Sequence, residues 1–374
     1  MAGANVAVAV KRRTINAILI MVLAYFKLGL IVSVMAGVDP PTVYYSAADY
    51  TLFQKFVVLL INLIYVFLAA WLLRRFLPKA FVLSVYSNWA LIALAILSVL
   101  YVNAGNLELS RTEIKENASA ISTFVAAISY SYLAAIVLCD RNPAKFYSAI
   151  AALVFAVILS YEREVILFLF IPLMLRLDRG SAALVKIGAI FLASVLVLTG
   201  YKYIASLVRG DVSPTSSSEF WDFVQLSLLR DNMHTGFLEL AYFAGRSPDY
   251  NNISYFLPVQ IERLFNAGAL TNGQMASLFY TSGRTGTGFS ALLEAWLNFG
   301  PFGVLVLPLL VALGMRRVAF AGSAFLFVAT TIFVFKLQRS DLWPAIIGYL
   351  LAPVVVVMIV GVARTARRAR RRLA

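Results

Sequence analysis

Long apolar stretches recur along this chain, and each is close to the length of a helix that crosses a bilayer. A hydrocarbon core about 30 Å thick requires about 20 mostly apolar residues per helix. Hydrophobic residues make up 61% of the 374 residues and charged residues only 13%, which no soluble domain matches. Backbone polar groups inside a bilayer must be satisfied within the protein, which favours helices. The sequence therefore predicts an all-α, polytopic transmembrane helical bundle, with residues 1–374 forming a single membrane domain.

We expect about ten spans, joined mostly by short loops. The sixth span is short and contains Pro172, so every later orientation depends on it. The approximate boundaries are Ile15–Ala36, Leu52–Leu73, Ala80–Val102, Ala120–Cys139, Ala144–Ser160, Glu164–Leu177, Ala182–Ala205, Phe289–Met315, Phe320–Leu337 and Leu342–Ala363.

The basic residues indicate the orientation, because Lys and Arg beside membrane spans concentrate on the cytoplasmic side. If the N-terminus is cytoplasmic, only two acids, Asp140 and Asp178, fall in cytoplasmic flanks. We therefore expect both termini in the cytoplasm, and the Arg-rich tail suits anionic lipid headgroups better than nucleic acid. The basic residues in these flanks are Lys11, Arg12, Arg13, Arg74, Arg75, Lys79, Arg141, Lys145, Arg176, Arg179, Lys186, Arg316, Arg317, Arg364, Arg367, Arg368, Arg370, Arg371 and Arg372.

One segment, residues 206–287, is too long to be a simple connector, and this topology places it outside the membrane as a periplasmic loop. Loops of this length are usually functional or disordered. Its many aromatic residues argue against disorder, and Trp221, Tyr242 and Tyr255 are candidates for stacking on sugars. Apolar residues at helical spacing predict two amphipathic helices at the interface, Glu219–Leu229 and Met233–Arg246.

Three arginines lie in outer connectors, at or just before the start of a helix. They are Arg163, Arg284 and Arg339. A guanidinium beside the positive end of a helix favours an anion, and its planar fork matches phosphate oxygens. Taken singly, Arg163 and Arg339 are better explained by a headgroup contact or a local ion pair, and the Gly-rich turn that holds Arg284 by a flexible entry to a helix. Together they predict a diphosphate site at the outer leaflet.

Lys27 is the exception to this pattern, because it lies well inside the first expected span. A lysine there either extends its ammonium group outward to the interface or faces a cavity, where it would contact substrate.

Two residues are candidate general bases. His234 is the only histidine, and on a helix Arg230 and Asp231 would lie one turn before it. Glu294 follows the Gly-rich turn in the first turns of the eighth span. The alternatives are a local capping or pairing role for His234, and pairing with a positive helix end for Glu294. With one His and one Cys in the chain, we expect no catalytic metal.

Two stretches of the sequence resemble the Wzy-type O-antigen and polysaccharide repeat-unit polymerases of bacterial inner membranes. One is Gly286-Thr-Gly-Phe-Ser-Ala-Leu-Leu-Glu294-Ala-Trp-Leu-Asn298-Phe-Gly300-Pro-Phe-Gly303, a Gly-Phe-Ser turn followed by an acid and by Asn-Phe-Gly. The other is Leu159-Ser-Tyr-Glu-Arg163-Glu-Val-Ile-Leu, which places an arginine before an apolar helix.

The resemblance implies a metal-independent membrane glycosyltransferase without a cofactor. It would transfer a glycan from undecaprenyl diphosphate to the sugar of another lipid-linked repeat unit, with a chain-length-regulating co-polymerase as partner. Arg163 would contact the diphosphate or glycan, and Arg284 and Glu294 would flank the reacting centre. The roles of Lys27, Arg230, His234 and Arg339 rest on the residues alone.

Two other functions fit the same architecture. An O-antigen ligase would transfer the glycan to lipid A-core and would use a histidine of its long loop, which keeps His234 relevant. A polysaccharide or glycolipid transporter would also be apolar and polytopic, but it would place polar groups at mid-membrane on broken helices.

Overall fold

Helices dominate the computed structural model, and three of them have the length and apolar composition of a membrane span. The structure describes residues 4–36, 50–104, 120–160, 163–177, 183–208, 239–240, 243, 290–337 and 346–373. The three candidate spans are α3 (Leu52–Phe76), residues Ile121–Cys139 of α6 (Ala120–Cys139), and the segment Gly300–Ala321, which contains α14 (Gly303–Ala321). The predicted membrane character is thereby supported, and the ten-span topology stays a prediction.

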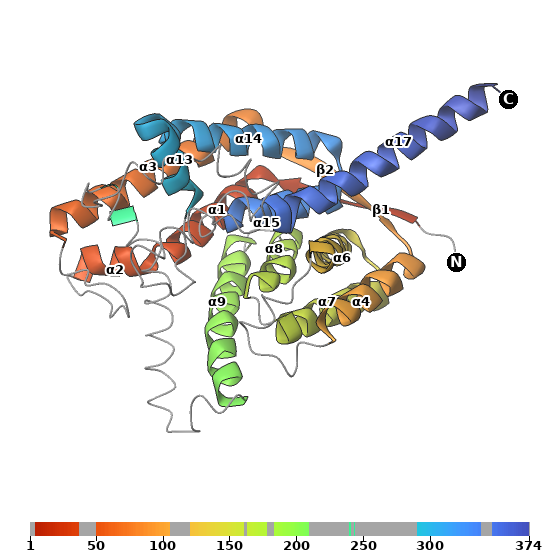
Figure 1. The fold of residues 1–374 in the computed structure, drawn as a ribbon, viewed down its shortest axis with the longest axis horizontal. Coiled ribbons are helices and arrows are strands. Elements are labelled where there is room, and N and C mark those ends of the chain that lie inside the picture. Colours follow the sequence, from red (N-terminus) through yellow and green to blue (C-terminus); the bar gives the residue numbers. More distant parts are fainter. Residues whose placement is uncertain are drawn as a thin grey trace.

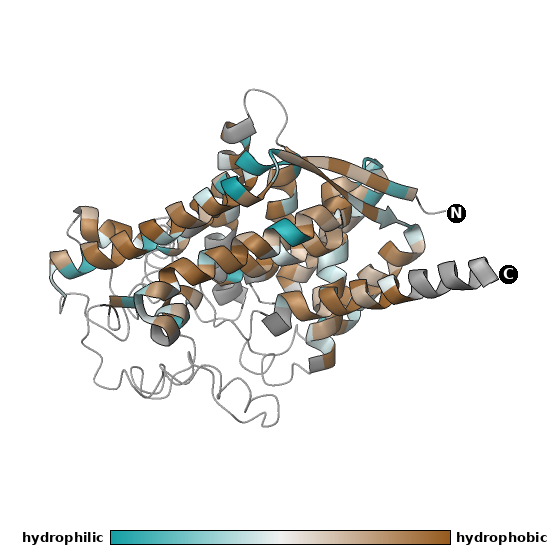
Figure 2. Cartoon of the chain, turned by 90° about the horizontal axis from the view of Figure 1, so that it is seen from above, coloured by the Kyte–Doolittle hydropathy of each residue, from teal (hydrophilic) through white to brown (hydrophobic). Residues whose placement is uncertain are grey.

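The other helices offer shorter apolar stretches among the described residues (Figure 1), and apolar residues cover most of the helical ribbon (Figure 2). A fourth candidate span is the pair α1 (Arg12–Phe26) and α2 (Leu28–Ala36), which meet at an angle of 67°. The other helical elements are α4 (Trp89–Asn103), α7 (Pro143–Ser160), η2 (Arg163–Ile166), α8 (Leu167–Arg176), α9 (Ala183–Val208), α13 (Ala291–Phe299), η4 (Gly300–Phe302), α15 (Ala324–Lys336), η5 (the π-helical Ile346–Leu351) and α17 (Ala352–Leu373).

Local sequence signals explain where α3 begins and ends. Thr51 and Gln54 form a capping box, in which the Thr51 hydroxyl accepts from the Gln54 amide and the Gln54 side chain accepts from the Thr51 amide. Arg74 and Arg75 occupy the last turn, where positive charge favours the negative end of the helix. The helix packs along α14 (Figure 1).

The expected span Ala80–Val102 is wrong in its first third. Ala80–Ser87 is a strand, β2, which pairs antiparallel with β1 (Ala4–Lys11), and only the rest of the segment is helical, as α4. Leu83, Val85 and Ser87 are buried, so burial alternates along β2 as it does along a half-buried strand. The chain is therefore mostly helical with a two-stranded sheet, and not all-α.

The expected span Phe289–Met315 is also not one helix. It divides at Gly300–Phe302, where Gly300 has a φ of +57° and Pro301 follows it. A Cβ on Gly303 would lie 2.1 Å from the backbone oxygen of Ala295, so the chain passes closely enough to exclude any side chain. The Asn-Phe-Gly-Pro-Phe-Gly sequence thus forms a tight turn between α13 and α14.

Several helix ends gather around the sheet. The Arg12 amide donates to the Lys79 carbonyl at 3.1 Å, and the Arg12 guanidinium donates to the carbonyls of Arg74 and Leu77 at 2.5 and 2.8 Å. Ser84 of β2 donates its amide to Gly322, which lies between α14 and α15. Arg12, Arg74 and Lys79 belong to flanks that the sequence predicts to be cytoplasmic. Ser84 and Gly322, which the sequence places inside expected spans, lie at this same end of the bundle.

Gly303 provides a test of the turn between α13 and α14. We expect Gly303→Ala to destabilise the protein by about 1–3 kcal/mol, because a side chain overlaps backbone that cannot move aside. Thermal unfolding of the detergent-solubilised protein measures the change. Gly314→Ala is the matched control, because nothing lies within 4 Å of its added Cβ. Equal stability of the two variants would contradict this account of the turn.

Candidate functional site

A buried polar cluster joins four separate parts of the chain. Glu239 Oε1 accepts from Lys27 Nζ at 2.5 Å and from the Ser290 hydroxyl at 2.6 Å, while Glu239 Oε2 accepts from Asn62 Nδ2 at 2.8 Å. Lys27 lies at the break between α1 and α2, Asn62 in α3, Glu239 in the long segment, and Ser290 at the N-cap of α13. The contacts therefore fix the long segment against three helical elements.

The members of this cluster are almost inaccessible to solvent. Lys27 is 3% exposed and Glu239 is 0% exposed. A buried charge is costly unless it is paired and its remaining hydrogen-bonding positions are satisfied. Here one carboxylate receives an ammonium group, a hydroxyl and an amide. Three donors thus engage the buried carboxylate of Glu239, and the Lys27 side chain is one of them.

The local backbone explains why Ser290 can serve both the helix and the cluster. Its hydroxyl accepts from the Leu293 amide at 3.1 Å, as an N-cap does, and donates to Glu239. The Ala291 amide donates to the Leu337 carbonyl at 2.8 Å, which ties the start of α13 to the end of α15. The start of α13 is therefore held from two sides.

Glu294 lies one helical turn after Ser290 and is only 2% exposed. Four residues along an α-helix correspond to about 6 Å, so Glu294 is close to the cluster along α13. Phe243 packs on Trp296 of the same helix, with ring centroids 4.8 Å apart. The described parts of the long segment therefore contact α13 beside the candidate base.

The start of α8 and the end of α15 come together at Tyr349. Arg163 is the first residue of η2, which leads into α8, where Phe168 stacks on Tyr349 with centroids 6.1 Å apart. Lys336 Nζ lies 5.7 Å from the centroid of the same ring, three residues before Arg339. The structure thus brings the start of α8 close to the end of α15, on either side of Tyr349.

Several predicted site residues lie outside the part of the chain that the structure describes. These are Arg230, His234, Arg284 and Arg339, together with the candidate stacking residues Trp221, Tyr242 and Tyr255. The described positions Glu239, Leu240 and Phe243 are helical, within the helix expected at Met233–Arg246. In the described ranges, no group of three or more His, Cys, Asp and Glu side chains is arranged to hold a metal ion.

Lys27 does not extend to the interface, because its ammonium group is buried against Glu239. A lysine already paired with a carboxylate is a weak anion ligand, so its predicted contact with diphosphate does not fit this geometry. Sequence reasoning missed Glu239, Asn62 and Ser290. One signal was available: a charged residue inside a span often pairs with an opposite charge, although the sequence does not identify which one.

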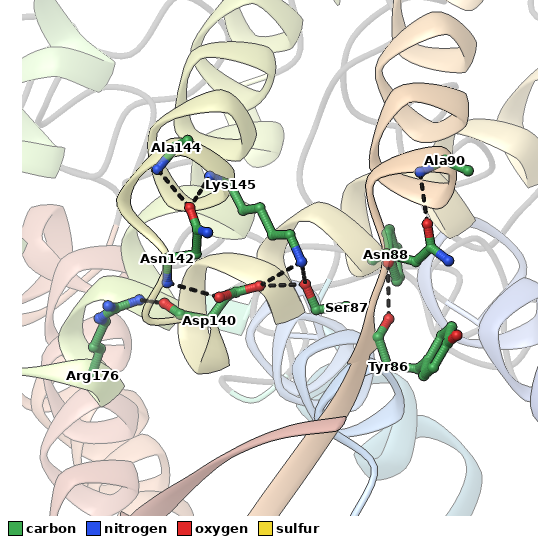
Figure 3. Close-up of polar contacts among 10 residues, drawn as sticks. Tyr86, Ser87, Asn88, Ala90, Asp140, Asn142, Ala144, Lys145 and Arg176 are labelled. Carbon is green, nitrogen blue, oxygen red and sulfur yellow. Dashed lines mark hydrogen bonds and ion pairs between the residues drawn. The ribbon is translucent and has the colours of Figure 1, made fainter. Parts of the chain in front are cut away.

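A second polar cluster fastens β2 to the corner between α6 and α7 (Figure 3). The Ser87 hydroxyl donates to Asp140 Oδ2 and accepts from Lys145 Nζ at 2.9 Å, and Asp140 Oδ1 accepts from the Asn142 amide at 2.8 Å. Arg176 of α8 donates to the Asp140 carbonyl at 2.6 Å. Because these contacts tie β2, α7 and α8 to the α6–α7 corner, we interpret this cluster as structural.

Comparison of the chain with known protein families, curated proteins and solved structures finds no match. The functional argument therefore rests on the sequence resemblance and on the geometry described above.

The Lys27–Glu239 pair can be tested by a double-mutant cycle. We expect Lys27→Met and Glu239→Gln each to lower the free energy of unfolding by about 3 kcal/mol, because each leaves a buried group without its partner. The double variant should lose clearly less than the sum. Thermal or denaturant unfolding of the purified protein provides the measurement, and strictly additive losses would show that the two groups do not interact.

Proposed function

We propose that this chain is a membrane glycosyltransferase that polymerises lipid-linked glycan repeat units. It transfers a glycan from undecaprenyl diphosphate to the sugar of another lipid-linked unit at the periplasmic face of the bacterial inner membrane, without a metal ion. The observation that carries the proposal is the buried anchoring of the long segment on α13, the helix that bears Glu294 within the polymerase-like motif.

In the proposed reaction, a hydroxyl of the acceptor sugar attacks the anomeric carbon of the donor glycan. The bond from that carbon to the diphosphate oxygen breaks, and the lipid diphosphate leaves with the bonding electrons. A general base takes the proton of the attacking hydroxyl. Positively charged arginines stabilise the charge that develops on the diphosphate, as a preorganised electrostatic site does.

The two buried carboxylates suit different roles in this reaction. Glu239 already accepts three hydrogen bonds, one of them from Lys27, and is therefore a poor base. We assign it to positioning the long segment. Glu294 and His234 remain the two candidate bases, and Arg163, Arg230, Arg284 and Arg339 are the proposed ligands of the diphosphate and glycan.

A transporter is the second candidate, and one observation favours it. The ion pair of Lys27 and Glu239 lies at a break in the first candidate span, and transporters place polar sites at such breaks. The two charges of the pair neutralise each other, however, so a substrate would have to displace one partner.

An O-antigen ligase differs from a polymerase in its acceptor, and gene deletion separates the two functions. A ligase mutant accumulates polymerised lipid-linked chains, whereas a polymerase mutant still attaches single repeat units to core.

Substitution of the candidate base and of the arginines tests the chemistry. We expect Glu294→Gln to lower the rate of chain extension by about 10²–10⁴-fold if it is the base, and Arg163→Ala and Arg339→Ala to abolish polymer ladders. Membrane levels should be unchanged. Arg141→Ala is the control, because Arg141 is an exposed arginine of the α6–α7 corner. Normal ladders in both arginine variants would refute the diphosphate site.

Reconstitution separates polymerisation from transport. Purified protein in liposomes with lipid-linked repeat units should produce polymer in the presence of a chelator and without any ion gradient or nucleotide. The lengths of the products on a gel and the side of the membrane on which the substrate lies are both measured. Substrate movement across the membrane without polymer would support the transporter and reject the polymerase.

A further inference from the structure

At the end of α3 and α14 where the sheet lies, four exposed arginines gather without a carboxylate partner among the described residues. Arg74 and Arg75 lie in the last turn of α3, and Arg316 and Arg317 lie in the last two turns of α14. The Arg316 guanidinium lies 5.9 Å from the ring centroid of Phe76, so the two helix ends are in contact. Each pair therefore adds to the positive potential of the other.

No carboxylate lies on the elements that surround these arginines. The elements β1, α1, α3, β2 and α14 contain no Asp or Glu at all. Asp140, on the neighbouring corner, is engaged by Ser87, Lys145 and Asn142. Lys79 adds a further exposed positive charge. The Arg12 guanidinium donates hydrogen bonds to the backbone carbonyls of Arg74 and Leu77. The counter-charge must come from outside the described part of the chain.

The surface that leads to the arginines is apolar on both helices. On α3, Phe67 and Trp71 are 67% and 60% exposed, and Arg74 and Arg75 follow Trp71 by three and four residues. Residues at these spacings lie on one face of a helix. The row of exposed apolar side chains on α3, which we call its apolar stripe, therefore ends at Arg74 and Arg75.

The same arrangement occurs on α14. Leu310 and Leu313 are 60% and 39% exposed, and Arg316 and Arg317 follow Leu313 by three and four residues. Phe320, one turn further, is 67% exposed. Two neighbouring helices thus present parallel apolar stripes that both end in paired guanidinium groups.

We propose that this surface, formed by Phe67, Trp71, Arg74, Arg75, Leu310, Leu313, Arg316 and Arg317, binds anionic glycerophospholipids. Guanidinium forks match phosphate oxygens, and basic residues beside membrane helices attract anionic headgroups. The apolar stripes fit the acyl chains of the same molecule. A soluble anion would bind the arginines but would leave the apolar side chains beside them uncovered. A lipid covers both, and we therefore propose a lipid as the ligand. The site is independent of the proposed polymerase chemistry.

Trp71 provides a local probe of this site. The full-length protein is reconstituted in phosphatidylcholine vesicles that contain about 10% of either phosphatidylglycerol or phosphatidylcholine with brominated acyl chains, because bromine quenches nearby tryptophan. Subtracting the fluorescence of the Trp71→Phe variant isolates the Trp71 signal. We expect brominated phosphatidylglycerol to be enriched at least about fivefold over brominated phosphatidylcholine, and the enrichment to fall with added salt.

Charge variants decide whether the enrichment is specific. R74Q/R316Q removes one arginine from each helix, and we expect it to lose most of the enrichment. R141Q/K186Q also removes two exposed positive charges from predicted cytoplasmic flanks, but away from α3 and α14, and it should retain the enrichment. Far-UV circular dichroism and size-exclusion profiles confirm that both variants fold.

Three outcomes would overturn the proposal. Equal quenching by the two brominated lipids would show that Trp71 has no anionic neighbour. Equal loss in both double variants would show only a general attraction of charge. Displacement of the lipid by millimolar inorganic phosphate would show that the arginines recognise phosphate alone.

Discussion

The buried ion pair between Lys27 and Glu239 is the interaction on which the organisation of the candidate site depends. A lysine inside an apolar bundle is tolerated only with a partner, and here the partner comes from a segment more than two hundred residues later in the chain. Asn62 and Ser290 complete the coordination of the carboxylate. One carboxylate therefore determines where the long segment returns to the helices.

The same contact links the break between α1 and α2 to α13. Ser290 connects Glu239 to the helix start, and the turn at Gly300–Gly303 directs the chain from α13 into α14. Glu294 is consequently held in the interior between an anchored N-cap and a turn that excludes side chains. At the opposite end, arginine side chains cap α3 and hold the α6–α8 corner, so the two ends of the bundle differ in their polar chemistry. In the proposed polymerase, one end would carry the reaction and the other would contact the lipid surface.

Residue patterns predicted the long apolar helices well and the short irregular features poorly. The expected spans at Leu52–Leu73 and Ala120–Cys139 agree with α3 and α6, because a run of about twenty mostly apolar residues is compatible with few structures other than a long helix. The strand Ala80–Ser87 was missed, because a short apolar run is compatible with either a strand or a helix until its pairing partner is known. For the candidate site, the sequence indicated Lys27 and Glu294. It could not indicate Glu239, because a contact between residues more than two hundred positions apart produces no periodic pattern in the sequence.

The most direct test of the central claim is whether residue 239 lies beside residue 27 in the membrane. The single native cysteine, Cys139, is replaced by Ser, and Leu28→Cys is combined with Leu240→Cys, so that Lys27 and Glu239 both stay in place. A flexible bifunctional thiol cross-linker is applied to membranes, and the linked peptides are identified by mass spectrometry. The ion pair predicts efficient cross-linking of positions 28 and 240, and none when Trp71→Cys, near the C-terminal end of α3, replaces Leu28→Cys. Absence of the 28–240 cross-link in folded protein, or equal cross-linking of both pairs, would contradict this placement.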